Sequence, residues 1–324
     1  MKKILLIFLI ILLLIFYLFS HNKKDHNSNK ITLAEVTHSI FYAPLYVAIE
    51  NDYFKDEGLD IELVLTSGAD KVSAAIISGD AQIGLAGAES AIYIYNSGEK
   101  DYLQIFSGLT KRDGQFILGR KRDEKFTLDK LKNKEVLVGR KGGMPSLNFI
   151  NALDNSVVNT KNININYQID FASLSGAFIS GTGDYVNLFE PNATMLEKNN
   201  QGYILSSIGK YSGEMPYTVF YAKKSYINNN SDLCKKFTSA INKGLEYVKN
   251  HEPIEIAEII SKQFPDNSIK ELEQMIKHYK DADTWLSNSI VTESSLKNLE
   301  DLLIKNNLIK DYVPYKKLVK NYEW

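Results

Sequence analysis

Histidine, cysteine and serine side chains, which carry most metal and nucleophilic chemistry in proteins, form no catalytic motif in this sequence. The single cysteine, Cys234, excludes an intramolecular disulfide, a CxxC redox pair and a cysteine-rich zinc site. The histidines show neither HExxH nor HxH spacing, and no GxSxG segment occurs. The five histidines are His21, His26, His38, His251 and His278. We therefore expect no catalytic residue, no metal site and no cofactor, and we disfavour metal and serine hydrolases.

One glycine-rich segment has a spacing that suits ligand binding. Gly139-Arg-Lys-Gly142-Gly143-Met-Pro-Ser146 follows an apolar strand and opens a helix, where backbone N–H groups and the helix dipole collect a polar ligand group. The segment lacks the Gly-Lys-Ser/Thr of a P-loop, which disfavours nucleoside triphosphate hydrolysis. A tight turn that simply needs glycine is an equally good interpretation, and the two are compatible.

The elements that must position such a segment alternate between strand and helix. From residue 31, apolar alternation predicts strands and 3.6-residue periodicity predicts helices of about ten residues. The expected strands are 31–36, 61–65, 83–85 and 103–109, and the expected helices are 43–51, 71–78 and 90–96. This rhythm predicts a parallel sheet with crossover helices.

A second round of the same pattern begins near Thr127 and predicts a second α/β lobe. Its expected strands are 136–138, 163–169 and 185–188, and its expected helices are 146–153 and 174–180. The pattern of residues 217–222 predicts one more strand. The rest of the chain predicts a helical tail, over 233–250, 254–264, 269–278 and 294–305, which we expect to pack on the first lobe because it has no core of its own.

The composition agrees with two globular domains. The chain has 324 residues, of which 44% are apolar and 24% charged. Its formal net charge is -1, so no cationic field is available to hold phosphates, and we expect no nucleic-acid partner.

The N-terminus differs from the rest of the chain. Met1-Lys2-Lys3 precedes the apolar run Ile4 to Phe19, and a polar stretch follows. We interpret residues 1–20 as an export signal that stays uncleaved as an anchor, because Phe19-Ser20-His21 offers only one small residue for cleavage. Residues 21–30 are then a tether. The chain is expected outside the cytoplasm, attached to the outer face of the cell membrane or secreted after signal cleavage.

Several segments, in family order, are similar to solute-binding proteins of the thiamine-pyrimidine-precursor, sulfonate, taurine and nitrate family. The matching segments are Phe41-Tyr-Ala-Pro-Leu-Tyr-Val-Ala48, Asp52-Tyr-Phe-Lys-Asp-Glu-Gly-Leu-Asp60, Ser78-Gly-Asp-Ala-Gln-Ile-Gly84, Leu128-Asp-Lys-Leu-Lys-Asn-Lys134 and Gly183-Asp-Tyr-Val-Asn-Leu-Phe-Glu-Pro191. The pyrimidine-precursor branch of that family usually carries tryptophan in the first loop, where this chain has Phe41-Tyr42.

The resemblance implies an α/β fold of the two-lobe type II periplasmic-binding-protein class. Each lobe is expected to be a mostly parallel sheet flanked by helices, with a ligand cleft between the lobes. Lobe one is expected at 31–118 plus 220–324 and lobe two at 119–219. Such proteins close on a small-molecule ligand by a hinge and present it to an ABC permease and its ATPase.

Ligands of open α/β sheets lie beyond the carboxyl ends of the strands, so the residues that follow each strand are the candidates for the cleft. The predicted ligand-binding residues are His38, Ser39, Phe41, Tyr42, Gly68, Gly87, Glu89, Gly142, Gly143, Met144, Phe189 and Glu190. Core packing remains an alternative for Phe41 and Tyr42. For Glu190, the alternative is a carboxylate at a helix N-terminus, next to Pro191.

These residues favour an amino-bearing heterocycle such as a thiamine pyrimidine precursor. Aromatic faces stack on flat rings, and the carboxylates of Glu89 and Glu190 accept N–H bonds while repelling anions. A sulfonate, taurine or nitrate is the alternative ligand, if a lysine or arginine intervenes. A pyrimidine-synthase-like enzyme of the same fold, whose cysteine-rich motif is missing here, and a tethered sensory domain are the alternatives from other classes.

Overall fold

A computed structural model of the chain describes residues 30–66 and 68–323. The predicted signal anchor, residues 1–20, and all but the last residue of the predicted tether lie outside the described residues. Within the described ranges, the structure has no helix that is both long and apolar enough to span a membrane.

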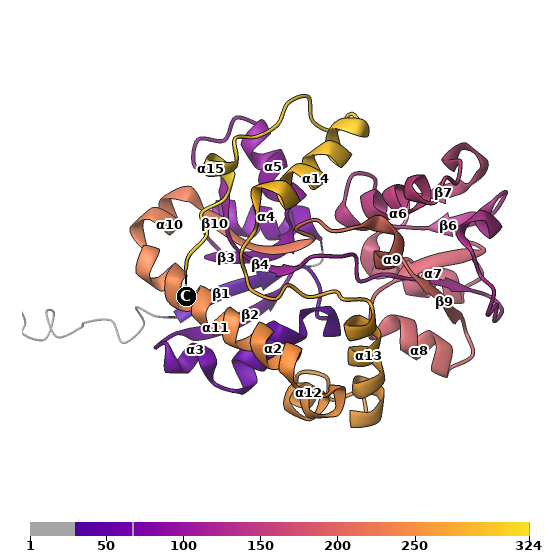
Figure 1. The fold of residues 1–324 in the computed structure, drawn as a ribbon, viewed down its shortest axis with the longest axis horizontal. Coiled ribbons are helices and arrows are strands. Elements are labelled where there is room, and N and C mark those ends of the chain that lie inside the picture. The colour runs from indigo at the N-terminus through magenta and orange to yellow at the C-terminus, as the bar shows by residue number, and fades with distance from the viewer. Residues whose placement is uncertain (1–29, 67, 324) are drawn as a thin grey trace, which may run out of the picture. The chain divides into compact units, whose positions relative to one another are not determined.

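The first sheet has five strands in the order β2-β1-β3-β10-β4 (Figure 1). They are β1 (Lys30–Glu35), β2 (Asp60–Leu65), β3 (Ile83–Gly87), β4 (Leu103–Thr110) and β10 (Thr218–Lys223). Strand β1 is parallel to β3, whereas β10 runs antiparallel to both β3 and β4. Strand β4 lies at one edge of this sheet and is nevertheless buried along its whole length.

The second sheet repeats this arrangement in the order β7-β6-β8-β5-β9. Its strands are β5 (Phe116–Gly119), β6 (Glu135–Leu137), β7 (Asn164–Asn166), β8 (Tyr185–Leu188) and β9 (Tyr203–Ser207). Strand β6 is parallel to β7 and β8, and β5 is the antiparallel member, paired with β8 and β9. Each sheet is thus mostly parallel with one reversed strand.

The chain passes from the first sheet to the second between Thr110 and Phe116, and it returns between Ser207 and Thr218. The predicted limits of the lobes, 118/119 and 219/220, fall inside β5 and β10, each of which belongs wholly to one sheet. These limits stay predictions.

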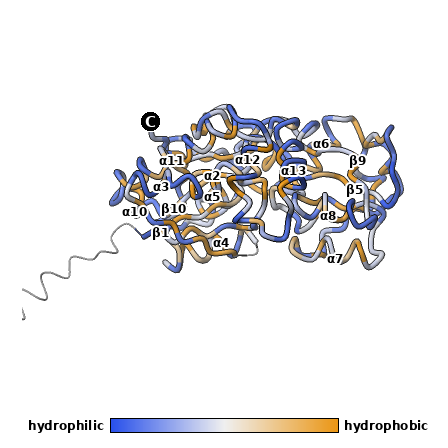
Figure 2. Tube along the Cα trace, turned by 90° about the horizontal axis from the view of Figure 1, so that it is seen from below, coloured by the Kyte–Doolittle hydropathy of each residue, from blue (hydrophilic) through white to orange (hydrophobic). Residues whose placement is uncertain are grey.

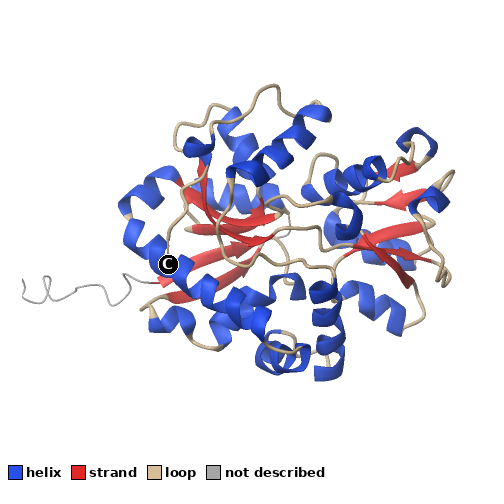
Figure 3. Cartoon of the chain, in the orientation of Figure 1, coloured by secondary structure: helices blue, strands red, loops and turns tan. Residues whose placement is uncertain are grey.

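Helices flank both sheets (Figure 3). The α-helices are α2 (Ala43–Glu50), α3 (Tyr53–Asp56), α4 (Ala69–Ser78), α5 (Glu89–Asn96), α6 (Met144–Asn155), α7 (Leu174–Ile179), α8 (Asn192–Lys198), α9 (Gly209–Ser212), α10 (Lys224–Asn229), α11 (Ser231–Asn250), α12 (Pro253–Ile260), α13 (Ile269–Asp281), α14 (Glu293–Lys305) and α15 (Tyr315–Leu318). Short 3-10 turns are η1 (Ile40–Tyr42), η2 (Leu128–Leu131), η3 (Thr160–Asn162), η4 (Phe171–Ser173) and η5 (Ser261–Gln263).

Local chemistry sets several helix limits. Ser268 and Glu271 form a capping box that starts α13, and Gly79 adopts a φ of 93° where α4 ends. Helix α11 packs closely on α2 because Gly244 has no side chain. A Cβ atom at this position would lie 2.1 Å from the carbonyl oxygen of Pro44. The buried hydrophobic residues form two core clusters. Hydrophobic stretches of the chain occur in both lobes (Figure 2).

Helix α11 also contains the single cysteine of the sequence. Cys234 is a buried free thiol, and burial raises its pKa to about 12. A thiol with so high a pKa carries almost no thiolate at neutral pH and is chemically inert there.

The helical tail contacts both lobes, whereas the sequence predicted contacts with lobe one alone. It packs on the first sheet through α11, but α13 also reaches the second lobe, where the rings of His278 and Tyr279 contact Phe116 of β5. An ion pair joins Lys198 of α8 to Glu271 of α13. The prediction that the tail packs on lobe one therefore accounts for only part of its contacts.

Candidate functional site

A cleft of about 360 Å³ lies between the two sheets. Its walls come from the carboxyl ends of β1, β3, β6 and β8 and from the start of β10, which is where the topology of open α/β sheets places ligands. The lining residues are Val36, Thr37, Tyr42, Gly68, Ala69, Asp70, Lys71, Gly87, Glu89, Val138, Gly139, Arg140, Gly143, Met144, Pro145, Asp170, Phe171, Ala172, Ser173, Phe189, Tyr217 and Thr218.

The structure brings seven of the predicted ligand-binding residues to this cleft and leaves five outside its lining. Those in the lining are Tyr42, Gly68, Gly87, Glu89, Gly143, Met144 and Phe189. Those outside it are His38, Ser39, Phe41, Gly142 and Glu190. That any of them binds a ligand stays a prediction.

Glu89 is the most unusual polar group of the cleft. It begins α5 and is 1% exposed. Its Oε1 accepts a hydrogen bond from the Met144 N–H at 3.3 Å, whereas its Oε2 has no hydrogen-bond partner among the described residues. Burial raises the pKa of Glu89 to about 7, although the positive charge of Arg140 acts in the opposite direction.

The space for this carboxylate depends on a missing side chain. A Cβ atom at Gly87 would lie 2.0 Å from Glu89 Oε2 and 2.5 Å from Met144 Cγ. Glycine at the end of β3 is therefore needed for the carboxylate to lie against the backbone.

Aromatic rings form much of the remaining wall. Phe189 contacts Phe171 edge-on, with ring centroids 5.6 Å apart, and Tyr217 lies beside Phe189. Phe41 lies behind them with its ring 5.1 Å from Phe189 and is fully buried, so it supports the wall as a core residue. Aromatic faces in such a wall can stack on a flat ring.

Several lining residues were not among the predicted ones. Arg140 belongs to the glycine-rich segment, and its Nε lies 3.9 Å from Asp70 Oδ1 across the cleft. Lys71 follows Asp70 at the start of α4. Arg140 could have been chosen from its place after an apolar strand, but Tyr217 could not, because it comes before its strand and not after it.

Glu190 lies behind the cleft wall, and its carboxylate is fully engaged. Oε2 accepts from the Thr194 N–H at 2.8 Å, and Oε1 accepts from the Thr194 hydroxyl at 2.8 Å and lies 2.8 Å from His278 Nδ1. The backbone N–H of Glu190 donates to the Tyr279 hydroxyl, and the Ser39 hydroxyl donates to the Glu190 carbonyl. The alternative of a helix N-terminal carboxylate agrees with the two bonds to Thr194, which lies in the first turn of α8, whereas the contacts with His278, Tyr279 and Ser39 come from other elements.

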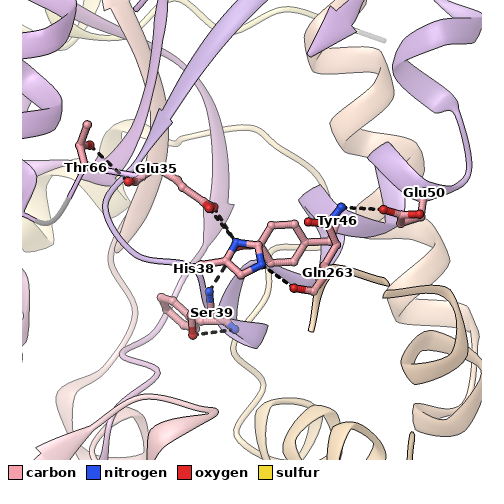
Figure 4. A network of polar contacts seen from close by, with 8 residues as sticks. Glu35, His38, Ser39, Tyr46, Glu50, Thr66 and Gln263 are labelled. Atoms are coloured by element: carbon pink, nitrogen blue, oxygen red, sulfur yellow. Dashed lines mark hydrogen bonds and ion pairs between the residues drawn. The ribbon is translucent and has the colours of Figure 1, made fainter. Parts of the chain in front are cut away.

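His38 belongs to a second polar network outside the cleft lining (Figure 4). Its Nδ1 lies 2.7 Å from Glu35 Oε1 and its Nε2 lies 2.9 Å from the Gln263 carbonyl oxygen, while the Tyr46 hydroxyl donates to Glu35 Oε2. Burial lowers the pKa of His38, but Glu35 and the Gln263 carbonyl outweigh burial and raise it above its ordinary value. The network ties the end of β1 to the helical tail.

Comparison with known proteins agrees with this architecture. Residues 40–254 match the family described as NMT1/THI5 like. YtlA of Bacillus subtilis (strain 168), a candidate binding protein, is 40% identical over 298 residues, which are 92% of this chain and 89% of that protein. The chain belongs to the NMT1/THI5-like family. The family resemblance predicted from the sequence is thereby confirmed.

Solved structures resemble this NMT1/THI5-like chain in fold. The alkanesulfonate-binding protein SsuA from Xanthomonas axonopodis pv. citri, bound to MOPS, has a TM-score of 0.72 at 14% identity, over 91% of this chain and 99% of that one. The Candida albicans CA3427 gene product, which has the generic periplasmic binding protein fold, has a TM-score of 0.68 at 17% identity, over 91% and 98%. The predicted two-lobe periplasmic-binding-protein fold is confirmed.

The contacts of Glu190 predict the effect of its substitution. In Glu190→Gln, one oxygen becomes an NH₂ group that faces the Thr194 donors or His278, so a buried donor is left without an acceptor. We expect a free energy of unfolding lower by roughly 2 kcal/mol and an unchanged ligand affinity. Thermal denaturation and titration calorimetry measure the two. Glu197→Gln on the same helix, whose pairing with Arg122 is long at 3.7 Å, is the control. A lost affinity with unchanged stability would return Glu190 to the ligand site.

The raised pKa of Glu89 predicts a pH-dependent stability. The folded protein keeps this proton up to a pH of about 7, whereas the unfolded chain releases it near 4.5. Folding thus binds a proton between these values, so the free energy of unfolding falls as pH rises from about 4.5 to 7. In Glu89→Gln we expect this fall to shrink by up to about 3 kcal/mol. Urea denaturation at pH 5 and pH 8 measures it, with exposed Glu124→Gln as the control. An equal fall in the free energy of unfolding between pH 5 and pH 8 in wild type and Glu89→Gln would contradict the raised pKa of Glu89.

Proposed function

We propose that this protein is an extracytoplasmic solute-binding protein that captures a small amino-bearing heterocycle, similar to a thiamine pyrimidine precursor, and delivers it to an ABC importer. The observation that carries this proposal is the buried carboxylate of Glu89, a lining residue of the cleft whose Oε2 has no hydrogen-bond partner among the described residues. A buried carboxylate oxygen without a hydrogen bond is costly, and a ligand N–H group would satisfy it.

The rest of the cleft suits a flat ring. Phe171, Phe189 and Tyr217 offer aromatic faces, and a volume of about 360 Å³ is typical of a site for a small organic molecule. An amino group on such a ring would point to Glu89 while the ring stacks on the aromatic wall. In this arrangement a neutral heterocycle is held by stacking and by a hydrogen bond to the Glu89 carboxylate.

Membership of the NMT1/THI5-like family and the likeness to YtlA support a binding role. The two sheets contribute opposite walls of the cleft, so a ligand contacts both lobes only when they are closed. Ligand binding then favours the closed form, which a membrane permease can recognise and empty with the help of its ATPase.

A sulfonate is the second candidate ligand. Arg140 and Lys71 line the cleft and could neutralise an anion, and the similar Xanthomonas protein binds alkanesulfonates. Against it stand three acidic lining residues, Asp70, Glu89 and Asp170, which outnumber the two basic ones. The ionised form of Glu89 would repel an anion.

The ligand test compares both chemistries on one protein. We expect an aminopyrimidine to raise the melting temperature, since a hundredfold excess over Kd stabilises the folded state by about 2.7 kcal/mol. In Glu89→Gln, calorimetry should show a 10- to 150-fold weaker affinity for the same aminopyrimidine, as expected when a charge-assisted acceptor is lost. Exposed Glu124→Gln should bind like wild type. Tighter binding of an alkanesulfonate to Glu89→Gln would favour the sulfonate, and turnover of the aminopyrimidine would favour an enzyme.

We also propose that residues 1–20 stay attached and hold the binding domain on the outer face of the membrane. The flanking lysines Lys2 and Lys3 would remain on the cytoplasmic side. Mass spectrometry of the membrane fraction should then find the intact N-terminus. A mature N-terminus between Ser20 and Lys30 would show that the segment is cleaved.

A further inference from the structure

Residues 139–145, which are the loop after β6 and the first two residues of α6, belong to the second lobe, contact the first lobe and line one side of the cleft. We call this segment the closing loop. Three contacts fix it to the first lobe. The Tyr93 hydroxyl donates to the Gly142 carbonyl at 2.8 Å, the Met144 N–H donates to Glu89 Oε1 at 3.3 Å, and Arg140 Nε lies 3.9 Å from Asp70 Oδ1.

These contacts differ in strength and in their relation to the cleft. The Arg140–Asp70 pair is long and both side chains are largely exposed, so it contributes little. The Met144–Glu89 bond joins two residues that themselves line the cleft. The Tyr93–Gly142 bond is the shortest of the three, and neither residue belongs to the lining.

We propose that Tyr93 is a latch that holds the closing loop on the first lobe and so keeps the cleft closed around its ligand. This inference rests on the proposed binding function, but Tyr93 does not touch the ligand in it. Tyr93 acts as a positioning residue, because it lies one turn along α5 from Glu89 and holds the loop that brings the Met144 N–H to that carboxylate.

The backbone of the closing loop is shaped for this contact. Gly142 has a φ of 81°, which turns the chain in a way that residues with a side chain rarely adopt. A Cβ atom built on Gly142 would lie 3.7 Å from the Tyr93 hydroxyl oxygen and 3.6 Å from Leu308 of the helical tail. Tyr93 and Leu308 thus pack against the loop where the Gly142 carbonyl accepts a hydrogen bond from the Tyr93 hydroxyl.

Because Tyr93 does not contact the ligand, loss of its hydrogen bond should change the rates of binding in a characteristic way. Removing one hydrogen bond from the closed form lowers its population relative to the open form, and the apparent Kd rises by the same factor. The ligand enters the open form, so the association rate should change little and the dissociation rate should rise. The loss of a neutral hydrogen bond corresponds to about a 2- to 12-fold change.

Tyr93→Phe removes the hydroxyl and keeps the ring, and Tyr95→Phe on the same helix, where the ring packs edge-on against Tyr102, is the matched control. The first measurement needs no ligand. Hydrogen–deuterium exchange of the Met144 amide and its neighbours in the closing loop should be several-fold faster in Tyr93→Phe than in wild type and in Tyr95→Phe. Unchanged exchange would overturn the latch.

The second measurement uses an aminopyrimidine as the probe and follows its association and dissociation by stopped flow. We expect a 2- to 12-fold faster dissociation in Tyr93→Phe with an association rate close to that of wild type. A slower association with unchanged dissociation would also overturn the latch. If wild type does not bind the aminopyrimidine, the proposed ligand is wrong, while the exchange measurement still decides the latch.

Discussion

Burying one carboxylate between two lobes is the constraint on which the rest of this site depends. A charge removed from water must be neutralised, paired or hydrogen-bonded. Here the start of α5 places Glu89 at the interface, glycine at position 87 leaves room for its oxygen, and the closing loop supplies the Met144 N–H. Only one of the two oxygens is satisfied by this arrangement. The other oxygen is the one that the proposed ligand would meet with a hydrogen-bond donor.

A separate set of contacts couples the lobes without using the cleft. Helix α13 belongs to the tail after β10, yet Tyr279 and His278 bind the backbone and carboxylate of Glu190 in the second lobe. In the first passage between the sheets, Asp113 is fully buried and accepts hydrogen bonds from the backbone and side chain of Gln115. Burial raises the pKa of Asp113 to about 7. Gln115 Oε1 and Ser212 Oγ in the two passages between the sheets have no hydrogen-bond partner among the described residues, and neither does the Tyr217 hydroxyl in the cleft lining.

Local pattern was enough to predict most of the elements but not their partners. The strand expected at 185–188 is β8, and the helix expected from 269 begins there because Ser268 caps it. Strand β9 was not predicted, since its residues are only partly buried and lack a clear alternation. The role of Glu190 depends on Ser39, Tyr279 and His278, which are distant in sequence. Spacing along the chain could not distinguish a carboxylate that faces a cleft from one that caps a helix behind it.

The solitary cysteine in α11 has a practical consequence. Cys234 is buried in the first lobe and its thiol is kept protonated by burial, so it does not compete for maleimide or iodoacetamide dyes in the folded protein. A new cysteine placed on an exposed position of either lobe would be the sole reactive thiol. The native chain can therefore carry an environment-sensitive fluorophore near the mouth of the cleft without prior removal of any residue. Opening and closing would then become an optical signal.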